Sequence, residues 1–297
     1  MLLGSFFKRV GLIDESFSAK MNKFAFAVAL PALLFQDISA VDIRESWNGG
    51  FVLFCFIATF LSITGVTVLS FFVVKREERG EFVQGAYRSS AAILGIAFIQ
   101  NIYGTSGMAP LMIIGTVPLY NAFAVIVLSL LKPGQRKMDK ALLQKTLKGI
   151  VTNPIILGIA AGFVWAILKI PQPEILQKTV KNMAVLATPL GLMAMGASFE
   201  GKKALGKLKP TLIASALKLV VLAAIFLPIA VWLGYRESEL VAILVMLGSA
   251  TTVSSFVMAR NMGHEGVLTS SIVMVTTLCS AFTLTGWLFL LKTLGLV

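Results

Sequence analysis

Charged residues are scarce in this chain. Of its 297 residues only 13% are charged, against about 25% in an ordinary soluble domain, while 57% are hydrophobic and the mean hydropathy is +0.87. So little charge cannot cover the surface of a soluble globule. The composition excludes a soluble protein and predicts an all-α integral membrane protein.

Cysteine, histidine and buried acids are almost absent. Cys55 and Cys279 both fall inside apolar runs, where free cysteine behaves as a small hydrophobe, and we expect the sole histidine, His264, to be solvated in a short loop. Asp37 and Glu200 stand near the ends of apolar runs, where interfacial charges are expected. No disulfide, metal site, cofactor or enzymatic activity is therefore predicted. The absence of a midplane acid also argues against a carboxylate relay for protons.

Apolar runs long enough to cross the bilayer fill most of the chain, since a crossing takes about 20 residues. The runs lie near 24–39, 51–74, 85–103, 109–131, 152–170, 183–199, 211–234, 240–259 and 267–291. Residues Met1 to Phe7 read as the tail of a further span, in a sequence with a late start or a truncation. A cleaved signal peptide is disfavoured, because Lys8 and Arg9 follow the apolar stretch rather than precede it.

The net charge of +12 is distributed as a topology signal and does not indicate nucleic acid. Eighteen of the 26 Lys and Arg residues fall on one side of the predicted spans: Lys8, Arg9, Lys20, Lys23, Lys75, Arg76, Arg79, Lys132, Arg136, Lys137, Lys140, Lys145, Lys148, Lys202, Lys203, Lys207, Lys209 and Arg260. Six fall on the other: Arg44, Lys169, Lys178, Lys181, Arg236 and Lys292. Positive charge accumulates in cytoplasmic loops. We expect a multi-pass protein of the cytoplasmic (plasma) membrane with its C-terminus outside.

The polar connection from Lys132 to Lys148 divides the chain into two halves. We expect a first repeat over 1–131, a basic cytoplasmic linker over 132–149 and a second repeat over 150–297. Met138, Leu142, Leu143 and Leu147 recur there at helical spacing. This pattern fits an interfacial amphipathic helix on anionic lipid, or a linker without a binding role.

Two proline-bearing spans lie 158 positions apart, around Pro31 and Pro189. Five spans separate equivalent points, so the second copy crosses in the opposite direction. Inverted repeats are typical of secondary transporters, whose substrate site lies between the halves.

The spans at 85–103 and 240–259 are unusually polar for simple membrane helices. The first carries Arg88, Ser89, Ser90 and Gly95, and the second carries the stretch 248–255, rich in Gly, Ser and Thr. They occupy corresponding places in the two halves, where discontinuous helices form binding sites. Close packing of helices through small residues is the alternative.

Several motifs together resemble the auxin efflux carrier family, whose bacterial members include malonate and malate carriers. The motifs are Gly11-Leu12-Ile13, Leu30 to Phe35, Arg88 to Ala97, Asn153 to Gly158, Thr188 to Leu190 and Ser254 to Gly263. The resemblance covers the whole chain. It implies ten helices in two inverted five-helix repeats, the first apparently truncated, with crossed broken helices 4 and 9. It also implies a scaffold of helices 1, 2, 6 and 7, often dimeric, and a transport domain of helices 3–5 and 8–10.

The chain departs from that family where the two broken helices cross. Ser90 and Ala97 stand where the family has Asn and the proline of helix 4, and Thr252 stands where helix 9 has its proline. Breaks then depend on Gly95, Gly248 and hydroxyl side chains. We expect them near Ala92–Ala97 and Gly248–Ser254.

The predicted site residues follow from these two spans and their neighbours. Those expected to bind substrate are Ser89, Ser90, Gly95, Asn121, Thr251, Thr252, Ser254 and Ser255. Arg88 and Lys218 are expected either to attract an anion or to snorkel to the interface.

The sequence thus predicts a secondary transporter of small organic anions, mono- or dicarboxylates such as malate or malonate, with an elevator-like mechanism. We expect a proton or sodium as its coupling ion, and the family resemblance implies a homodimer through the scaffold. One alternative is a sodium-coupled organic-solute symporter of the bile-acid-carrier type. Another is a non-transporting membrane sensor or scaffold.

Overall fold

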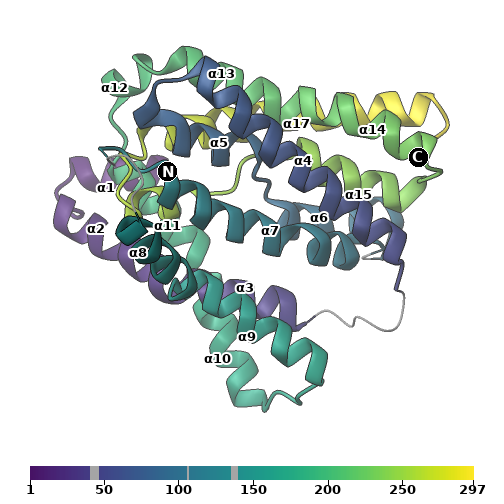
Figure 1. Ribbon diagram of the computed structural model, residues 1–297, viewed down its shortest axis with the longest axis horizontal. Coiled ribbons are helices and arrows are strands. Elements are labelled where there is room, and N and C mark those ends of the chain that lie inside the picture. Colours follow the sequence, from purple (N-terminus) through teal and green to yellow (C-terminus); the bar gives the residue numbers. More distant parts are fainter. Residues whose placement is uncertain (41–46, 106, 135–139) are drawn as a thin grey trace.

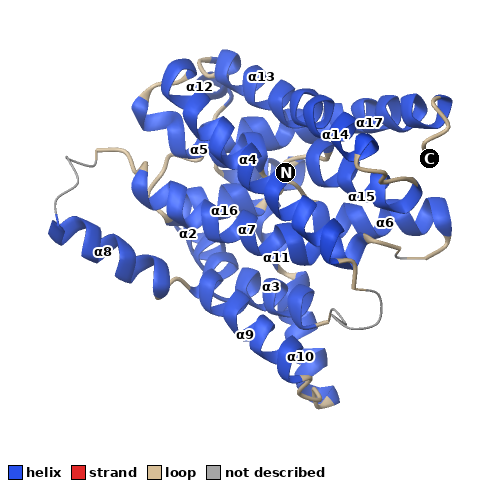
Figure 2. Ribbon diagram, turned by 45° about the vertical axis from the view of Figure 1, so that its right-hand side comes forward, coloured by secondary structure: helices blue, strands red, loops and turns tan. Residues whose placement is uncertain are grey.

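The protein is helical throughout the part of the chain that its computed structural model describes, residues 1–40, 47–105, 107–134 and 140–297 (Figures 1 and 2). No strand occurs in those ranges, so the expected all-α class is confirmed. Arg44, Arg136, Lys137 and Met138 lie outside the described residues.

The described residues of the first half of the chain form seven α-helices. They are α1 (Leu2–Arg9), α2 (Glu15–Phe24), α3 (Leu30–Ser39), α4 (Gly49–Val73), α5 (Arg79–Tyr87), α6 (Ala91–Tyr103) and α7 (Ala109–Leu130). A π-helical turn, Ala25–Ala29, joins α2 to α3, and a 3₁₀ turn, Arg76–Glu78, precedes α5.

From Lys140 onward the described chain forms ten more α-helices. They are α8 (Lys140–Val151), α9 (Pro154–Leu168), α10 (Glu174–Val185), α11 (Ala187–Ala197), α12 (Gly201–Leu205), α13 (Leu208–Ala216), α14 (Leu222–Trp232), α15 (Glu237–Gly248), α16 (Ser254–Asn261) and α17 (Val267–Thr293). A second π-helical turn, Leu217–Val221, joins α13 to α14.

Six helical segments in the described residues are long and apolar enough to cross a membrane. They are Glu15–Ser39, Gly49–Val73, Ala109–Leu130, Glu174–Ala197, Leu208–Trp232 and Val267–Thr293. The protein is therefore a multi-pass membrane protein. The other predicted spans differ, since 85–103 and 240–259 are each interrupted and α9 has only 15 residues. At 1.5 Å per residue α9 is about 22 Å long, shorter than the hydrocarbon core.

The helices pack in two groups (Figure 1). In one group, α3 lies against α9 and α10, while α1 and α2 lie against α11. In the other, α4 packs on α5 and α7, α15 packs on α6, α14 and α17, and α13 packs on α5 and α17. The seam between the groups is lined by the continuous helix from α2 to α3 on one side and by α16 on the other.

Both proline motifs distort their helices just before the proline. Because Pro31 has no N–H to donate to the carbonyl four residues earlier, the helix widens there, and Leu30 N–H donates to Ala25 O in the π-helical turn. In the second motif, the helix is interrupted at Leu186, three residues before Pro189. The shared sequence feature thus produces a shared local irregularity.

Glycine allows the first group to pack closely. A Cβ atom at Gly158 of α9 would lie 2.7 Å from Pro31 O, and one at Gly4 of α1 would lie 2.3 Å from Met193 O. Such distances are shorter than any real contact, so larger residues would push the helices apart. Small residues let membrane helices approach in this way.

Three smaller expectations have clear outcomes. Cys55 is buried in α4 and Cys279 is exposed on α17, and both are free thiols. The expectation for His264 is wrong: its side chain is 3% exposed, and Nε2 lies 2.9 Å from Leu128 O. Burial lowers the pKa of His264, an effect partly offset by that carbonyl. The basic connection does contain a helix, α8, which lies at the edge of the molecule in Figure 2.

Candidate functional site

Two interrupted helices meet in the interior of the protein. In the first, α5 ends at Tyr87 and α6 begins at Ala91, with Arg88 in extended conformation between them. The expected break at Ala92–Ala97 is therefore misplaced by several residues. Ser89 and Ser90 favour helix ends, because their hydroxyls compete for backbone hydrogen bonds and serine is a preferred N-cap residue.

The second interruption lies where the sequence predicted it. Helix α15 ends at Gly248 and α16 begins at Ser254, so the break falls within Gly248–Ser254. Ser249 has extended backbone angles. Glycine and hydroxyl residues thus produce this break without proline.

Hydrogen bonds join the two interruptions directly. Ser90 N–H donates to Ala250 O at 3.0 Å, and Thr251 Oγ1 donates to Gly85 O at 2.7 Å. The Ser89 hydroxyl donates to Met246 O. Unwound backbone inside a membrane protein must find such partners, and here each break supplies them to the other.

A small cavity of about 50 Å³ lies where the interruptions face α3. Its polar lining comes from six predicted residues, Arg88, Ser89, Ser90, Asn121, Thr252 and Ser254, together with Asp37 and Tyr120. Its apolar lining is Leu30, Leu33, Leu34, Ala91, Ala92 and Val117. Most of the predicted polar residues are therefore in one place.

Arg88 is the buried cation of this cavity, with only 3% of its surface exposed. Its guanidinium donates to Asn121 Oδ1 and to Met258 Sδ, the latter at 2.7 Å. Asn121 is oriented by its own bond from Nδ2 to Val117 O at 2.8 Å. Within the described residues no carboxylate forms an ion pair with Arg88, so its charge is available to an anion.

Two helix N-termini open on the same cavity. Ser90, Ala91 and Ala92 begin α6, and Thr252 and Ser254 stand at the start of α16. The first N–H groups of a helix have no intrahelical acceptor and carry partial positive charge. Together with Arg88 they present hydrogen-bond donors and positive charge to the cavity.

Sequence reasoning missed two polar lining residues, Asp37 and Tyr120. Asp37 was expected to be an interfacial charge, yet it lines the cavity from α3 and has no ion-pair partner among the described residues. The signal was its position two turns after Pro31 in the same helix. Tyr120 donates from its hydroxyl to Met246 O at 2.8 Å. Its position next to Asn121 in the sequence does not predict this contact.

Four other predicted residues do not line the cavity. Gly95 lies inside α6 beside Met112 of α7, where an added Cβ would come within 2.6 Å of Met112 Cε. Thr251 is buried and bonded to Gly85, and Ser255 is fully buried with no partner for its hydroxyl in the described chain. Lys218 is fully buried and donates to Leu247 O instead.

A larger cavity of about 820 Å³ opens at the more basic end of the molecule, along the same seam. We call it the vestibule. Its charged lining is Lys8, Glu15, Lys23, Glu200, Lys203, Arg260 and Glu265, and its deeper lining includes Asn22, Phe26, Ala27, Phe256 and Asn261. Ala27 and Leu30 are one turn apart on one helix, so the vestibule ends close to the small cavity.

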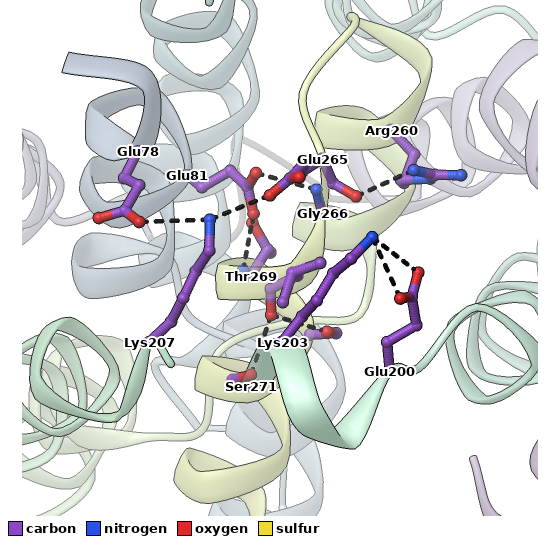
Figure 3. A network of polar contacts seen from close by, with 12 residues as sticks. Glu78, Glu81, Glu200, Lys203, Lys207, Arg260, Glu265, Gly266, Thr269 and Ser271 are labelled. Carbon is purple, nitrogen blue, oxygen red and sulfur yellow. Dashed lines mark hydrogen bonds and ion pairs between the residues drawn. The ribbon is translucent and has the colours of Figure 1, made fainter. Parts of the chain in front are cut away.

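Lys207, between α12 and α13, contacts two other connections beside the vestibule, the one before α5 and the one before α17 (Figure 3). Its ammonium lies 3.2 Å from Glu78 Oε1 and 3.0 Å from Glu265 Oε2. Burial acts to lower the pKa of Lys207, but the two carboxylates outweigh it and raise the pKa. The same contact lowers the pKa of Glu265.

The buried carboxylate of Glu81 lies at the same end of the structure. Glu81 accepts hydrogen bonds from Gly266 N–H and Thr269 N–H, each at 2.9 Å, and so caps the start of α17 (Figure 3). No three His, Cys, Asp or Glu side chains of the described residues gather where they could hold a metal ion.

Comparison with known proteins gives two findings. A family described as "Membrane transport protein" matches residues 1–288. A protein of Rhizobium meliloti (strain 1021) named "Putative malonate transporter" is 26% identical over 283 residues, which cover 92% of this chain and 86% of that relative. The family match spans nearly the whole chain and confirms the resemblance in the motifs. The protein therefore belongs to this membrane transport family, that of the auxin efflux carriers.

Proposed function

We propose that the protein is a secondary transporter of small organic anions, mono- or dicarboxylates such as malate or malonate. One observation carries the proposal: Arg88, Asn121 and the N-termini of α6 and α16 face one cavity. Backbone N–H groups and a guanidinium fork are the groups that bind carboxylates best. The name of the Rhizobium relative agrees with this substrate class.

The two packing groups support an elevator-like mechanism. The group of α1–α3 and α9–α11 is the proposed scaffold, and the group with both interrupted helices is the proposed transport domain. At about 50 Å³ the cavity is far smaller than the roughly 300 Å³ of a typical ligand pocket. Substrate therefore enters when the transport domain moves away from α3. Its path from the vestibule follows the boundary between the two helix groups.

The proposed scaffold also offers a face for dimer formation. Leu157, Val164, Ile167 and Leu168 of α9 and Ile175 of α10 are exposed apolar residues. Lipid contact explains them equally well, so native mass spectrometry of the detergent-solubilised protein decides between a dimer and a monomer.

A proton is the coupling ion that the cavity favours. Asp37 and Arg88 line the same small space, so a dicarboxylate bound to Arg88 lies close to the Asp37 carboxylate. Two like charges at short range are costly at low dielectric. Protonation of Asp37 removes the repulsion and would carry one proton with each substrate.

For orientation, we propose that the vestibule faces the cytoplasm and the C-terminus faces out. The support is the concentration of Lys and Arg in the loops at the vestibule end. In a variant without Cys55 and Cys279, an impermeant thiol reagent added outside should label Leu294→Cys, which is exposed near the C-terminus, and spare Lys203→Cys. The reverse pattern contradicts this orientation.

Uptake by proteoliposomes tests the function itself. Purified protein is given a panel of labelled mono- and dicarboxylates, with pH and sodium gradients imposed separately. We expect saturable uptake of a carboxylate that a pH gradient stimulates. Neutral analogues such as the corresponding diamide should not compete. Absence of uptake for every carboxylate overturns the proposal.

A further inference from the structure

The C-terminal end of α15 is unusual because its carbonyl groups are occupied by protein donors. The last carbonyls of a helix lack intrahelical partners and carry partial negative charge. Here Met246 O accepts from the Tyr120 hydroxyl at 2.8 Å and from Ser89, and Leu247 O accepts from the Lys218 ammonium. This end of α15 lies at the interruption, beside the proposed substrate site.

Lys218 reaches that position from a distorted helix. It stands in the π-helical turn Leu217–Val221, and its side chain is fully buried. Trp287 of α17 also contacts this turn, donating from Nε1 to Leu219 O at 3.1 Å. Within the described residues no carboxylate forms an ion pair with Lys218, and its ammonium donates to a helix carbonyl, Leu247 O.

The first interrupted helix is arranged differently. Gly85 O in the last turn of α5 accepts from the neutral Thr251 hydroxyl. The buried guanidinium of Arg88, the residue after α5, donates to Asn121 Oδ1 and Met258 Sδ and to no carbonyl of α5 in the described residues. A buried ammonium on a half-helix carbonyl is therefore a feature of α15.

In sodium-coupled transporters with broken helices, the C-terminal carbonyls of a half-helix help to hold the sodium ion. We propose that Lys218 is a tethered cation that takes this place at α15, so that the carrier needs no sodium ion at the crossing. Lys218 is then a positioning residue: it keeps the end of α15 closed and the Met246–Ala250 backbone in place for Ser89 and Ser90. This proposal rests on the proposed function, in which the substrate binds where the two interrupted helices meet.

The proposal predicts that charge at this point matters more than the bulk of the side chain. Lys218→Ala removes the fragment that corresponds to propylammonium. Lys218→Met keeps most of the length and removes the charge. Lys209→Ala removes an exposed lysine from the start of the same span and serves as the control.

The first experiment measures thermal stability of the purified protein in detergent, which requires no knowledge of the substrate. The wild type should melt at the same temperature in sodium and in N-methylglucamine buffers. Lys218→Ala and Lys218→Met should melt at lower temperatures. Propylammonium, a ligand of the folded state, should raise the melting temperature of Lys218→Ala with its concentration, whereas propanol should not.

The second experiment measures uptake in proteoliposomes without sodium. We expect wild-type and Lys209→Ala activity to be unchanged by removing sodium, and Lys218→Ala activity to fall about tenfold. Propylammonium should restore part of the lost activity. Failure of the wild type to transport any carboxylate would overturn the proposed function. The melting experiment would still test the role of Lys218, so the two failures can be told apart.

Three results overturn the inference. The first is a wild type that sodium stabilises or whose uptake requires sodium. The second is a Lys218→Met variant with wild-type stability and uptake. The third is equal rescue of Lys218→Ala by propanol and propylammonium, which would make Lys218 a packing residue. If neither variant folds, the sodium dependence of the wild type alone decides.

Discussion

Ser90 donates its backbone N–H to the carbonyl oxygen of Ala250 at 3.0 Å, across 160 residues of sequence. The bond joins the two interruptions, and it fixes the start of α6 against the end of α15. The proposed substrate-binding groups from both halves of the chain are therefore joined by a direct hydrogen bond. The proposals above depend on that arrangement.

We expect the two neighbouring threonines of the second interruption to differ, with Thr252 acting in substrate binding and Thr251 in stability. Thr252 lines the cavity and Thr251 does not, because its hydroxyl is buried against Gly85 O. Thr252→Val should raise the half-saturation concentration for uptake about tenfold, since a hydrogen bond to a charged group contributes about 1.5–3 kcal/mol. Its melting temperature should not change.

Thr251→Val is the matched comparison. It leaves Gly85 O without its partner in the protein interior, which costs about 1–3 kcal/mol of stability. We expect a lower melting temperature and a smaller effect on half-saturation than for Thr252→Val. Equal behaviour of the two variants in both assays would remove the distinction.

Arg88 should be required for the substrate's charge. Arg88→Met should abolish saturable carboxylate uptake, and Arg88→Lys should retain part of it, because lysine keeps the charge but not the two-pronged geometry. Arg76→Met, which changes an exposed arginine in the 3₁₀ turn before α5, is the control. Wild-type half-saturation in Arg88→Met would place the anion elsewhere.

Asp37 should govern the effect of pH on transport. An asparagine keeps the shape of the side chain and is permanently neutral, so Asp37→Asn should bind dicarboxylate without needing a proton. Uptake by the variant should no longer be stimulated by an acidic exterior, while exchange of internal for external substrate continues. A variant that keeps the full stimulation would exclude Asp37 as the proton carrier.

The Lys207 contacts make stability depend on pH in a defined way. The lowered pKa of Glu265 means that its contribution is present above the ordinary value of 4.5 and is lost as the pH falls below it. The raised pKa of Lys207 means that its contribution is present below 10.5 and is lost at still higher pH. The contribution of this contact to stability should therefore be constant between these limits.

Lys207→Met should lower the free energy of unfolding between these limits by about 1 kcal/mol or less, since water reaches these pairs. It should also weaken the loss of stability in acid. Lys209→Met, at an exposed lysine two residues away, should leave both unchanged. An unaltered acid decline in Lys207→Met would assign the pH dependence to other groups.

Much of the fold could be predicted from local sequence. Long apolar runs predict the six long helices, and the glycine and hydroxyl residues at 248–254 predict the second break where it occurs. The first break was misplaced because Gly95 was taken as a hinge, whereas it packs against Met112 of α7. A glycine that bends a helix and a glycine that admits a neighbour look the same in sequence.

The site could be predicted only in part, for a related reason. Residues inside the two polar spans were found because their polarity is costly in lipid. Asp37 was missed because its depth depends on how α3 packs, which no local pattern gives. His264 was misjudged in the same way, since a short loop can fold inward and bury a side chain.

The central claim is that a carboxylate binds at the cavity between the crossing and α3. Substrate protection tests it most directly, with Thr252→Cys in a variant lacking Cys55 and Cys279, treated with a small thiol reagent. The account predicts that substrate slows labelling of position 252, with half the effect at the concentration that half-saturates uptake, and leaves Lys203→Cys labelling unchanged. Normal uptake without protection at position 252 would contradict it.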